Sequence, residues 1–248
     1  MFRLLILASF AIAPSIAQVC SNSTLNGAYA YATDSIATVG GKTITNSQVG
    51  RIVFDGAGKF TVRAAVTSGG TTDVGSTSGE YLLGSDCTMT GKTAEGLEFD
   101  GVVVNAGSDF FIMVREPGVT SSGGGTKIEN QGACSAATLD GSFGYFAEGT
   151  ITSDAGVSGL GELGVLQFDG RGGVTGVYSA SLGGLVERKT YNGKYEVGQD
   201  CTANAQFTIS GANYLMNFTI ASTGNTFVFS IAGGGAVLTG QGSRIFPR

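Results

Sequence analysis

The chain repeats itself, and four cysteines mark the repeat. Cys20 and Cys87 are 67 positions apart, and Cys134 and Cys201 have the same spacing. Shifting the sequence by 114 residues aligns the two segments without a gap as far as the second cysteine of each copy, and the offset then grows to 117. An internal repeat of this length indicates two copies of one structural unit.

The residues shared by the two copies are turn glycines, aromatic residues and cysteines. They read Cys-x(3)-Thr-Leu-x-Gly-x-Tyr/Phe-x-Tyr, then Phe-Asp-Gly-x-Gly, then Gly-x-Tyr-x-x-Gly-x-Asp-Cys-Thr. Four cysteines that all form disulfides allow three pairings. The duplication favours a disulfide within each copy, Cys20–Cys87 and Cys134–Cys201, because a single ancestral unit would have had to pair its own cysteines.

Alternating residue types predict β-strands along the whole chain. Tyr29 and Tyr31 alternate with alanines, and Phe143 and Tyr145 occupy the matching positions of the second copy. One face of such a strand carries aromatic side chains and the other face carries small ones. Each copy holds seven or eight short segments of this kind, which is typical of antiparallel barrels and sandwiches.

We expect an all-β fold with one small antiparallel barrel per copy, over residues 18–130 and 131–248. A single sixteen-stranded barrel is the alternative. Residues 121–125 resemble a flexible linker, but their counterpart lies in the final strand region, so we interpret them as a hairpin turn before a last strand. The junction near residues 129–133 is short, so the two units should pack together. No predicted strand interior contains proline.

The N-terminus has the pattern of a secretory signal peptide. Arg3 precedes an apolar stretch over residues 4–13, and the small residues Ser15 and Ala17 follow at the −3 and −1 positions of a cleavage site. A membrane-spanning helix needs roughly 20 apolar residues, so this stretch is too short for one. We predict removal of residues 1–17, a mature chain beginning at Gln18, and a secreted protein, extracellular or periplasmic, without a membrane span.

Composition excludes several classes of function. The chain has no histidine, which excludes Ser-His-Asp catalysis and histidine metal sites. Its net charge of −5 opposes binding to nucleic acid or to an anionic membrane. We therefore predict no cofactor, no metal site and no nucleic-acid partner. Asn22 and Asn217 begin glycosylation sequons, which matter only in a eukaryotic host.

Two duplicated polar features invite a functional interpretation. Asp55 and Asp169 each precede a Gly-x-Gly segment and resemble parts of calcium loops. One carboxylate offers too few oxygens for calcium, so we interpret both as turns closed by the aspartate side chain. The duplicated cation, Lys127 or Arg244, either contacts an anionic ligand at a barrel mouth or is an edge charge or ion-pair partner.

Carboxylates present in both copies are the candidates for catalysis, because glycosidases use two of them. Turn or loop surroundings point to solvated surface groups, so we predict no catalytic residue. The four pairs are Asp34/Glu148, Asp55/Asp169, Asp73/Glu187 and Asp86/Asp200.

The repeated motifs resemble those of a group of exported bacterial β-proteins of unknown function, and they carry over no catalytic residue. More loosely, a barrel of this strand number resembles the calycin and allene-oxide-cyclase barrels, which hold apolar small molecules. A binding function would use the barrel interiors, where alanine and glycine leave room beside Tyr29, Tyr31, Phe143 and Tyr145.

We therefore predict a secreted, non-catalytic protein that binds a small apolar ligand or an extracellular surface partner. The alternatives are an extracellular structural or envelope protein and an enzyme that uses a duplicated carboxylate.

Overall fold

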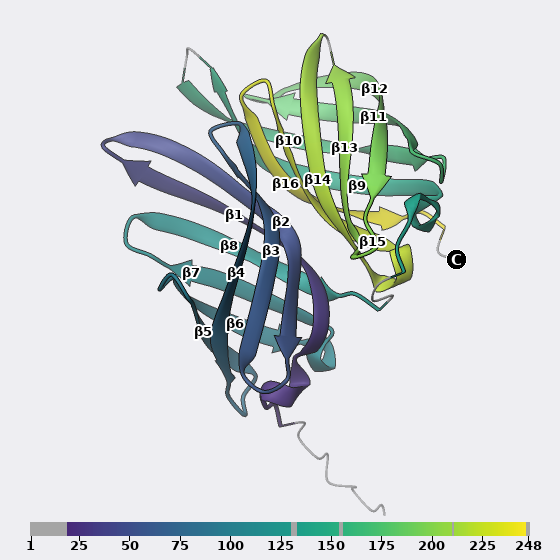
Figure 1. The fold of residues 1–248 in the computed structure, drawn as a ribbon. Helices are drawn as coiled ribbons and strands as arrows, with labels where there is room; N and C mark the ends of the chain where they lie inside the picture. The colour runs from purple at the N-terminus through teal and green to yellow at the C-terminus, as the bar shows by residue number, and fades with distance from the viewer. Residues whose placement is uncertain (1–18, 130–132, 154–155, 210, 247–248) are drawn as a thin grey trace, which may run out of the picture.

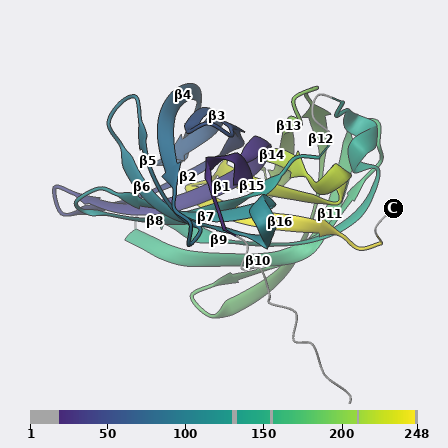
Figure 2. The same ribbon diagram turned by 90° about the horizontal axis from the view of Figure 1, so that it is seen from below.

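The structure is a computed structural model that describes residues 19–129, 133–153, 156–209 and 211–246. It contains two closed antiparallel barrels that lie side by side (Figures 1 and 2). The predicted signal peptide, its cleavage site and the predicted boundary between the two units lie outside the described residues.

Each strand pairs with the next one along the chain, and the last strand of each barrel closes on the first. The first barrel consists of β1 (Asn26–Val39), β2 (Lys42–Asp55), β3 (Lys59–Ser68), β4 (Thr71–Leu83), β5 (Thr88–Thr93), β6 (Glu98–Val104), β7 (Asp109–Arg115) and β8 (Val119–Lys127). The second consists of β9 (Gly141–Ser153), β10 (Gly156–Phe168), β11 (Gly173–Leu182), β12 (Leu185–Val197), β13 (Thr202–Ile209), β14 (Ala212–Ala221), β15 (Thr226–Gly233) and β16 (Ala236–Arg244). The short 3-10 helices are η1 (Asn22–Thr24), η2 (Asn105–Gly107), η3 (Ala136–Leu139) and η4 (Ser222–Gly224).

The predicted fold class is confirmed: the chain is all-β, with two closed eight-stranded barrels in tandem. The 3-10 helices lie at one end of each barrel, which we call the closed end, and the hairpins β1–β2 and β9–β10 lie at the other end, the mouth. The prediction of a turn over residues 121–125 was wrong. These residues run through β8, and the chain turns before it, around Pro117.

The closed-end half of each barrel is filled by aromatic rings. In the first barrel the Tyr29 and Phe54 centroids lie 5.5 Å apart and those of Phe54 and Phe110 lie 5.6 Å apart, both edge to face. Phe143 and Phe168 are 5.5 Å apart in the second barrel. Edge-to-face contacts at this spacing stabilise a core beyond simple area burial.

Eight buried rings of the two barrels, some in this half and some nearer the mouth, each face a glycine directly across a strand pair. A β-carbon at any of these glycines would collide with the ring, so the missing side chain makes the space that the aromatic residue fills. The pairs are Phe60/Gly79, Phe99/Gly91 and Phe110/Gly125 in the first barrel, and Tyr145/Gly164, Tyr191/Gly176, Phe207/Gly193, Phe229/Gly240 and Phe227/Gly242 in the second. This pairing accounts for Gly125 of β8, one of the glycines that resembled a linker.

Paired glycines also form the tight hairpins at the mouths. Both residues of each pair have positive φ, as type I′ turns require and as glycine adopts readily. The pairs are Gly40-Gly41, Gly69-Gly70, Gly183-Gly184 and Gly234-Gly235.

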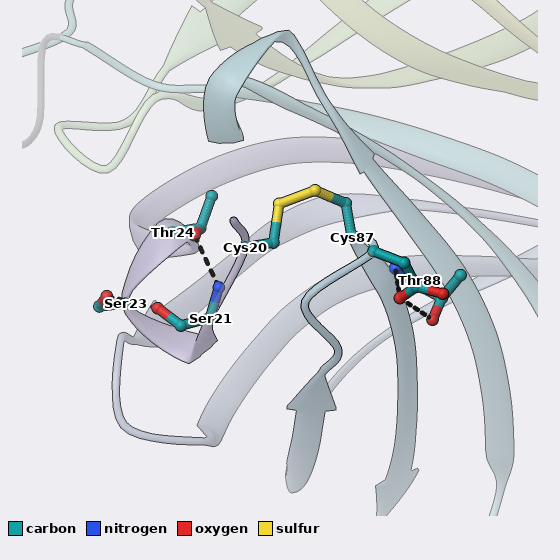
Figure 3. Close-up of a disulfide and its surroundings, with 7 residues drawn as sticks. Cys20, Ser21, Ser23, Thr24, Cys87 and Thr88 are labelled. Carbon is teal, nitrogen blue, oxygen red and sulfur yellow. Dashed lines mark hydrogen bonds between the residues drawn. A yellow bond between two sulfur atoms is a disulfide. The ribbon is translucent and has the colours of Figure 1, made fainter. Parts of the chain in front are cut away.

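Both predicted disulfides form, with Cα–Cα distances of 5.1 Å for Cys20–Cys87 and 5.0 Å for Cys134–Cys201. Each joins the segment before the first 3-10 helix of its barrel to the turn between the fourth and fifth strands, and Figure 3 shows the first of them. Beside it the Asp86 carboxylate accepts hydrogen bonds from the Thr88 amide and hydroxyl at 3.1 and 2.7 Å. A loop of this length contributes about 4 kcal/mol in the chain-entropy model.

The barrels pack against each other, as the short junction predicts. The outer faces of β1 and β2 meet those of β14, β15 and β16. Ala28 and Ala30 point out of the first barrel, are fully buried and belong to the core of the second. The aromatic face of β1 therefore fills one barrel, and its alanine face lets the second barrel approach closely.

The ring–glycine pairing predicts that Gly242→Val destabilises the protein by about 1–3 kcal/mol, the usual effect of overpacking a core. A β-carbon at Gly242 would lie 2.7 and 2.8 Å from two carbons of the Phe227 ring. Gly144→Val on the adjacent strand is the matched control, because a β-carbon there meets nothing within 4 Å. Urea unfolding midpoints measure both; equal effects would contradict the pairing argument.

Candidate functional site

The mouth half of the second barrel holds a group of polar and titratable side chains on the inward face. Side chains alternate between the two faces of a strand, and the buried Phe143 and Phe168 define the inward set. Glu162 belongs to this set and lies directly opposite Ala147 and Ala180 on the neighbouring strands. The group, which we call the Glu162 cluster, comprises Tyr145, Glu162, Tyr178, Glu187, Lys189 and Tyr191.

Three tyrosines form the floor of the cluster, and all of them are buried. The Tyr178 and Tyr191 centroids are 5.4 Å apart, Tyr191 lies 4.6 Å from Phe207, and Tyr145 lies 5.7 Å from Phe229. Burial raises the pKa of each phenol, to about 12 for Tyr178. The floor is therefore neutral at physiological pH and continues into the aromatic core below.

Glu162 is half-buried at the level of these phenols. Desolvation raises the pKa of its carboxyl from the ordinary 4.5 to about 7, and the positive charge of Lys189 opposes that rise. Within the described part of the chain, the carboxyl makes no hydrogen bond and no ion pair.

Lys189 is engaged elsewhere, by a glutamate two residues before it on the same strand. Its Nζ lies 2.8 Å from the Glu187 carboxylate. This contact lowers the pKa of Glu187 and raises that of Lys189. The ammonium group is therefore held by Glu187, and Glu162 is left as the unpaired carboxyl of the cluster.

The rim above the cluster is apolar. Leu160, Leu182 and Leu185 occupy inward register positions on the mouth side of Glu162. Leu182 is 42% exposed and Leu185 is 77% exposed. Apolar side chains beside a half-buried carboxyl match the chemistry of a molecule with an apolar body and a polar group. The carboxyl itself can accept a hydrogen bond or a positive charge, and it exchanges its proton near neutral pH.

The first barrel lacks this arrangement, although its strands match. Gln48 stands at the position of Glu162, and Ala64, Gly75 and Thr77 stand at those of Tyr178, Lys189 and Tyr191. Its rim is polar, with Asn46, Ser68 and Thr71 at the positions of the three leucines. The cluster is thus a specialisation of the second copy.

All four predicted pocket residues lie inside the barrels. Tyr29 and Phe143 are fully buried in the aromatic halves, whereas Tyr31 and Tyr145 lie one inward position nearer the mouths. The Tyr31 hydroxyl is buried without a hydrogen-bond partner among the described residues. Of the four, Tyr145 alone belongs to the Glu162 cluster. That any of the four contacts a ligand stays a prediction.

The duplicated cation seals the closed end instead of lining a mouth. Arg244 is buried, its guanidinium lies 4.5 Å from the Phe143 centroid, and it donates to the carbonyl oxygens of Thr138 (2.9 Å), Gly224 (3.1 Å) and Asp140. Neither predicted role, ligand contact or edge charge, describes it.

In the first barrel a tyrosine makes the equivalent contact. The Tyr29 hydroxyl donates to the Gly107 carbonyl oxygen, the counterpart of Gly224, while the Lys127 Nζ lies 5.9 Å from the Tyr29 centroid. The second copy has phenylalanine at this position, and its arginine supplies the missing donor.

The predicted turns at Asp55 and Asp169 are confirmed. Asp55 accepts hydrogen bonds from the amides of Ala57 (2.7 Å) and Lys59 (2.9 Å), and Asp169 is bonded in the same way. These bonds lower the pKa of both aspartates. Asp86 and Asp200 likewise accept from the threonine two residues later.

The remaining duplicated acids lie on different surfaces. Asp34 and Glu148 point outward and line one groove of about 800 Å³ between the barrels, beside the exposed Phe111 and Phe146. Asp73 lies at the mouth of the first barrel, across from Val66.

The two sequon asparagines lie in different surroundings. The Asn22 Oδ1 accepts a hydrogen bond from the Leu83 amide at 2.8 Å, and the Asn217 Nδ2 is buried in the cleft between the barrels.

Sequence reasoning missed Glu162 because it looked for acids present in both copies. A signal was available: Leu160, Glu162, Gly164, Leu166 and Phe168 alternate with outward residues along one strand. That alternation places Glu162 on the same face as the buried Phe168, where a carboxylate is uncommon.

Comparisons with known proteins give remote structural likenesses only. No family model matches the sequence, and no curated protein matches it. The redesigned β-barrel mFAP1, solved with DFHBI bound, is 20% identical, with 44% of this chain and 97% of that chain covered and a TM-score of 0.34. CghA is 8% identical, with 88% and 87% covered and a TM-score of 0.27. An AttH-like protein from Nitrosomonas europaea is 8% identical, with 97% and 99% covered and a TM-score of 0.30.

These likenesses are too distant to carry an argument about function, and the resemblance to exported bacterial β-proteins stays a prediction. The chain itself defines a tandem β-barrel protein with one disulfide in each barrel, and such bonds indicate an oxidising compartment. No helix among the described residues is long and apolar enough to cross a membrane.

The burial of Glu162 predicts a pH-dependent effect of Glu162→Gln. The folded-state pKa of Glu162, about 7, exceeds its ordinary 4.5, so the folded protein binds this proton more tightly than the unfolded chain. Stability therefore falls as pH rises from about 4.5 to about 7. At pH 8 the variant should be more stable than the parent by about 1–3 kcal/mol, and at pH 4 the difference should vanish.

Urea unfolding of both proteins at pH 4, 6 and 8 measures this effect. Glu148→Gln, an exposed glutamate on the outer face of β9, is the control for loss of one negative charge. A pH-independent effect of Glu162→Gln would show that Glu162 is solvated.

Proposed function

We propose that the protein binds a small apolar molecule without covalent chemistry, in the mouth of the second barrel. The observation that carries this proposal is the pairing of an apolar rim with a half-buried carboxyl that has no partner among the described residues. Burying a carboxyl without a partner is costly, and proteins retain such groups where a ligand or a reaction uses them.

The difference between the two copies supports the same proposal. The leucines of the rim and the members of the Glu162 cluster other than Tyr145 and Glu187 replace small or neutral residues of the first copy, whereas the residues that close the barrels are shared. The first barrel alone shows that the scaffold does not need these side chains. We infer that they serve binding and that the first barrel serves as a packed partner of the second.

We further propose that binding takes place outside the cytoplasm. The predicted signal peptide and the two disulfides support this location.

A neutral apolar fluorophore, N-phenyl-1-naphthylamine, tests the proposal on the full mature chain. We expect one bound fluorophore per chain, and we expect Ala180→Trp to weaken binding at least about tenfold, which corresponds to about 1.4 kcal/mol. Ala180 lies directly opposite Glu162 on the inward face, so an indole there fills the mouth.

Val66→Trp is the matched control, because Val66 is the counterpart of Ala180 in the first barrel and is itself 38% exposed. This variant should bind the fluorophore as the parent does. If both substitutions weaken fluorophore binding equally, or if neither weakens it, the fluorophore binds outside the second barrel's mouth.

A further inference from the structure

We propose that the mouth of the second barrel selects positively charged ligands: an organic ammonium group on an apolar or aromatic body, with the ammonium against Glu162. This inference rests on the proposed binding function and adds the charge of the ligand.

The charge balance of the mouth favours a cation. Its inward charged residues are Glu162 on β10 and Glu187 and Lys189 on β12, so the site carries one excess negative charge when all three are ionised. The facing positions on the other strands are uncharged and include Ala147, Ala180 and Leu238. Lys189 pairs with Glu187 at 2.8 Å, and no lysine or arginine among the described residues lies within 4 Å of Glu162.

The tyrosine floor suits the same kind of ligand. The rings of Tyr145, Tyr178 and Tyr191 are neutral, buried and adjacent to Glu162. Aromatic faces attract ammonium groups, and the attraction grows when water is excluded. A carboxyl beside several rings therefore favours an ammonium over a neutral hydroxyl of the same size.

An anionic ligand fits the site poorly. It would meet Glu162 without a free cation to compensate, because Lys189 already holds Glu187. A neutral apolar ligand would occupy the rim and leave the carboxyl unpaired. The ammonium is the group that compensates the carboxyl and so recovers part of the cost of its burial.

The first barrel supplies the contrast within one chain. Gln48 replaces the carboxyl, Ala64 and Thr77 replace two of the rings, and Asn46 and Ser68 replace rim leucines. The inference therefore predicts one cation per chain, not two.

Competition with the bound fluorophore tests the charge preference at pH 8. Three ligands share a phenyl body: 2-phenylethylamine, the neutral 2-phenylethanol and the anionic 3-phenylpropanoate. We expect the amine to displace the fluorophore at a concentration at least about tenfold lower than the alcohol, because hydrogen bonds to charged groups are the stronger ones. The carboxylate should be the weakest competitor.

Glu162→Gln, which installs the first barrel's amide, should remove the preference for the amine while the fluorophore still binds. Glu148→Gln removes a charge from the outer wall and should leave the preference intact. At pH 5, where Glu162 is protonated, the parent's preference should also shrink, since burial raises the pKa of that carboxyl to about 7. Far-UV circular dichroism confirms that each variant is folded.

The amine is also titrated directly, by NMR of the isotope-labelled protein, so that the result does not depend on the fluorophore. Resonance shifts confined to the second barrel's mouth are expected. Equal competition by amine and alcohol, or a preference that survives Glu162→Gln, would overturn the charge inference while apolar binding stands. If neither the fluorophore nor the amine binds in the mouth, both the charge inference and the proposed function fail.

Discussion

The packing of an aromatic ring over a cross-strand glycine is the contact on which both barrels depend. Phe227 over Gly242 and Phe110 over Gly125 are equivalent instances in the two copies. A small barrel has little interior volume, and at these positions a β-carbon opposite the ring would collide with it. The glycines let the sheets curve around the rings, and the rings restore the packing that glycine lacks. High glycine content is therefore a condition of this core.

The rings also divide each barrel into a closed end, whose residues are shared by the two copies, and a mouth, whose residues differ between them. The closed ends retain the disulfide and the Asp-Cys-Thr turn. They also retain a hydrogen-bond donor to the carbonyl oxygen of the glycine that ends η2 or η4, supplied by Tyr29 in one copy and by Arg244 in the other. At the mouths the two copies share the hairpins but few side-chain identities. Divergence at Gln48 and Glu162 was structurally permitted because that level lies beyond the rings that close the barrel.

The fold could be predicted from the sequence because its determinants are local and repeated. Alternation around Tyr29 and Phe143 and the glycine turns each depend on a few neighbouring residues, and the 67-residue cysteine spacing is repeated in both copies. The site could not, since Glu162 meets Tyr178, Lys189 and Tyr191 only through strand pairing. Glycines 123–125 were mistaken for a turn for a related reason: their surroundings are set across the sheet, where a β-carbon would meet Thr33 at Gly123, Phe111 at Gly124 and Phe110 at Gly125.

The seal at the closed end determines how a molecule could exchange with the second barrel. Arg244 and the carbonyl groups around it block one end, and the Phe143–Phe168 layer fills the space above. A molecule bound in the mouth would therefore enter and leave at the same end of the barrel, beside the short Gly183-Gly184 hairpin. A barrier at that hairpin would slow association and dissociation equally, and so lengthen residence time without changing the equilibrium affinity.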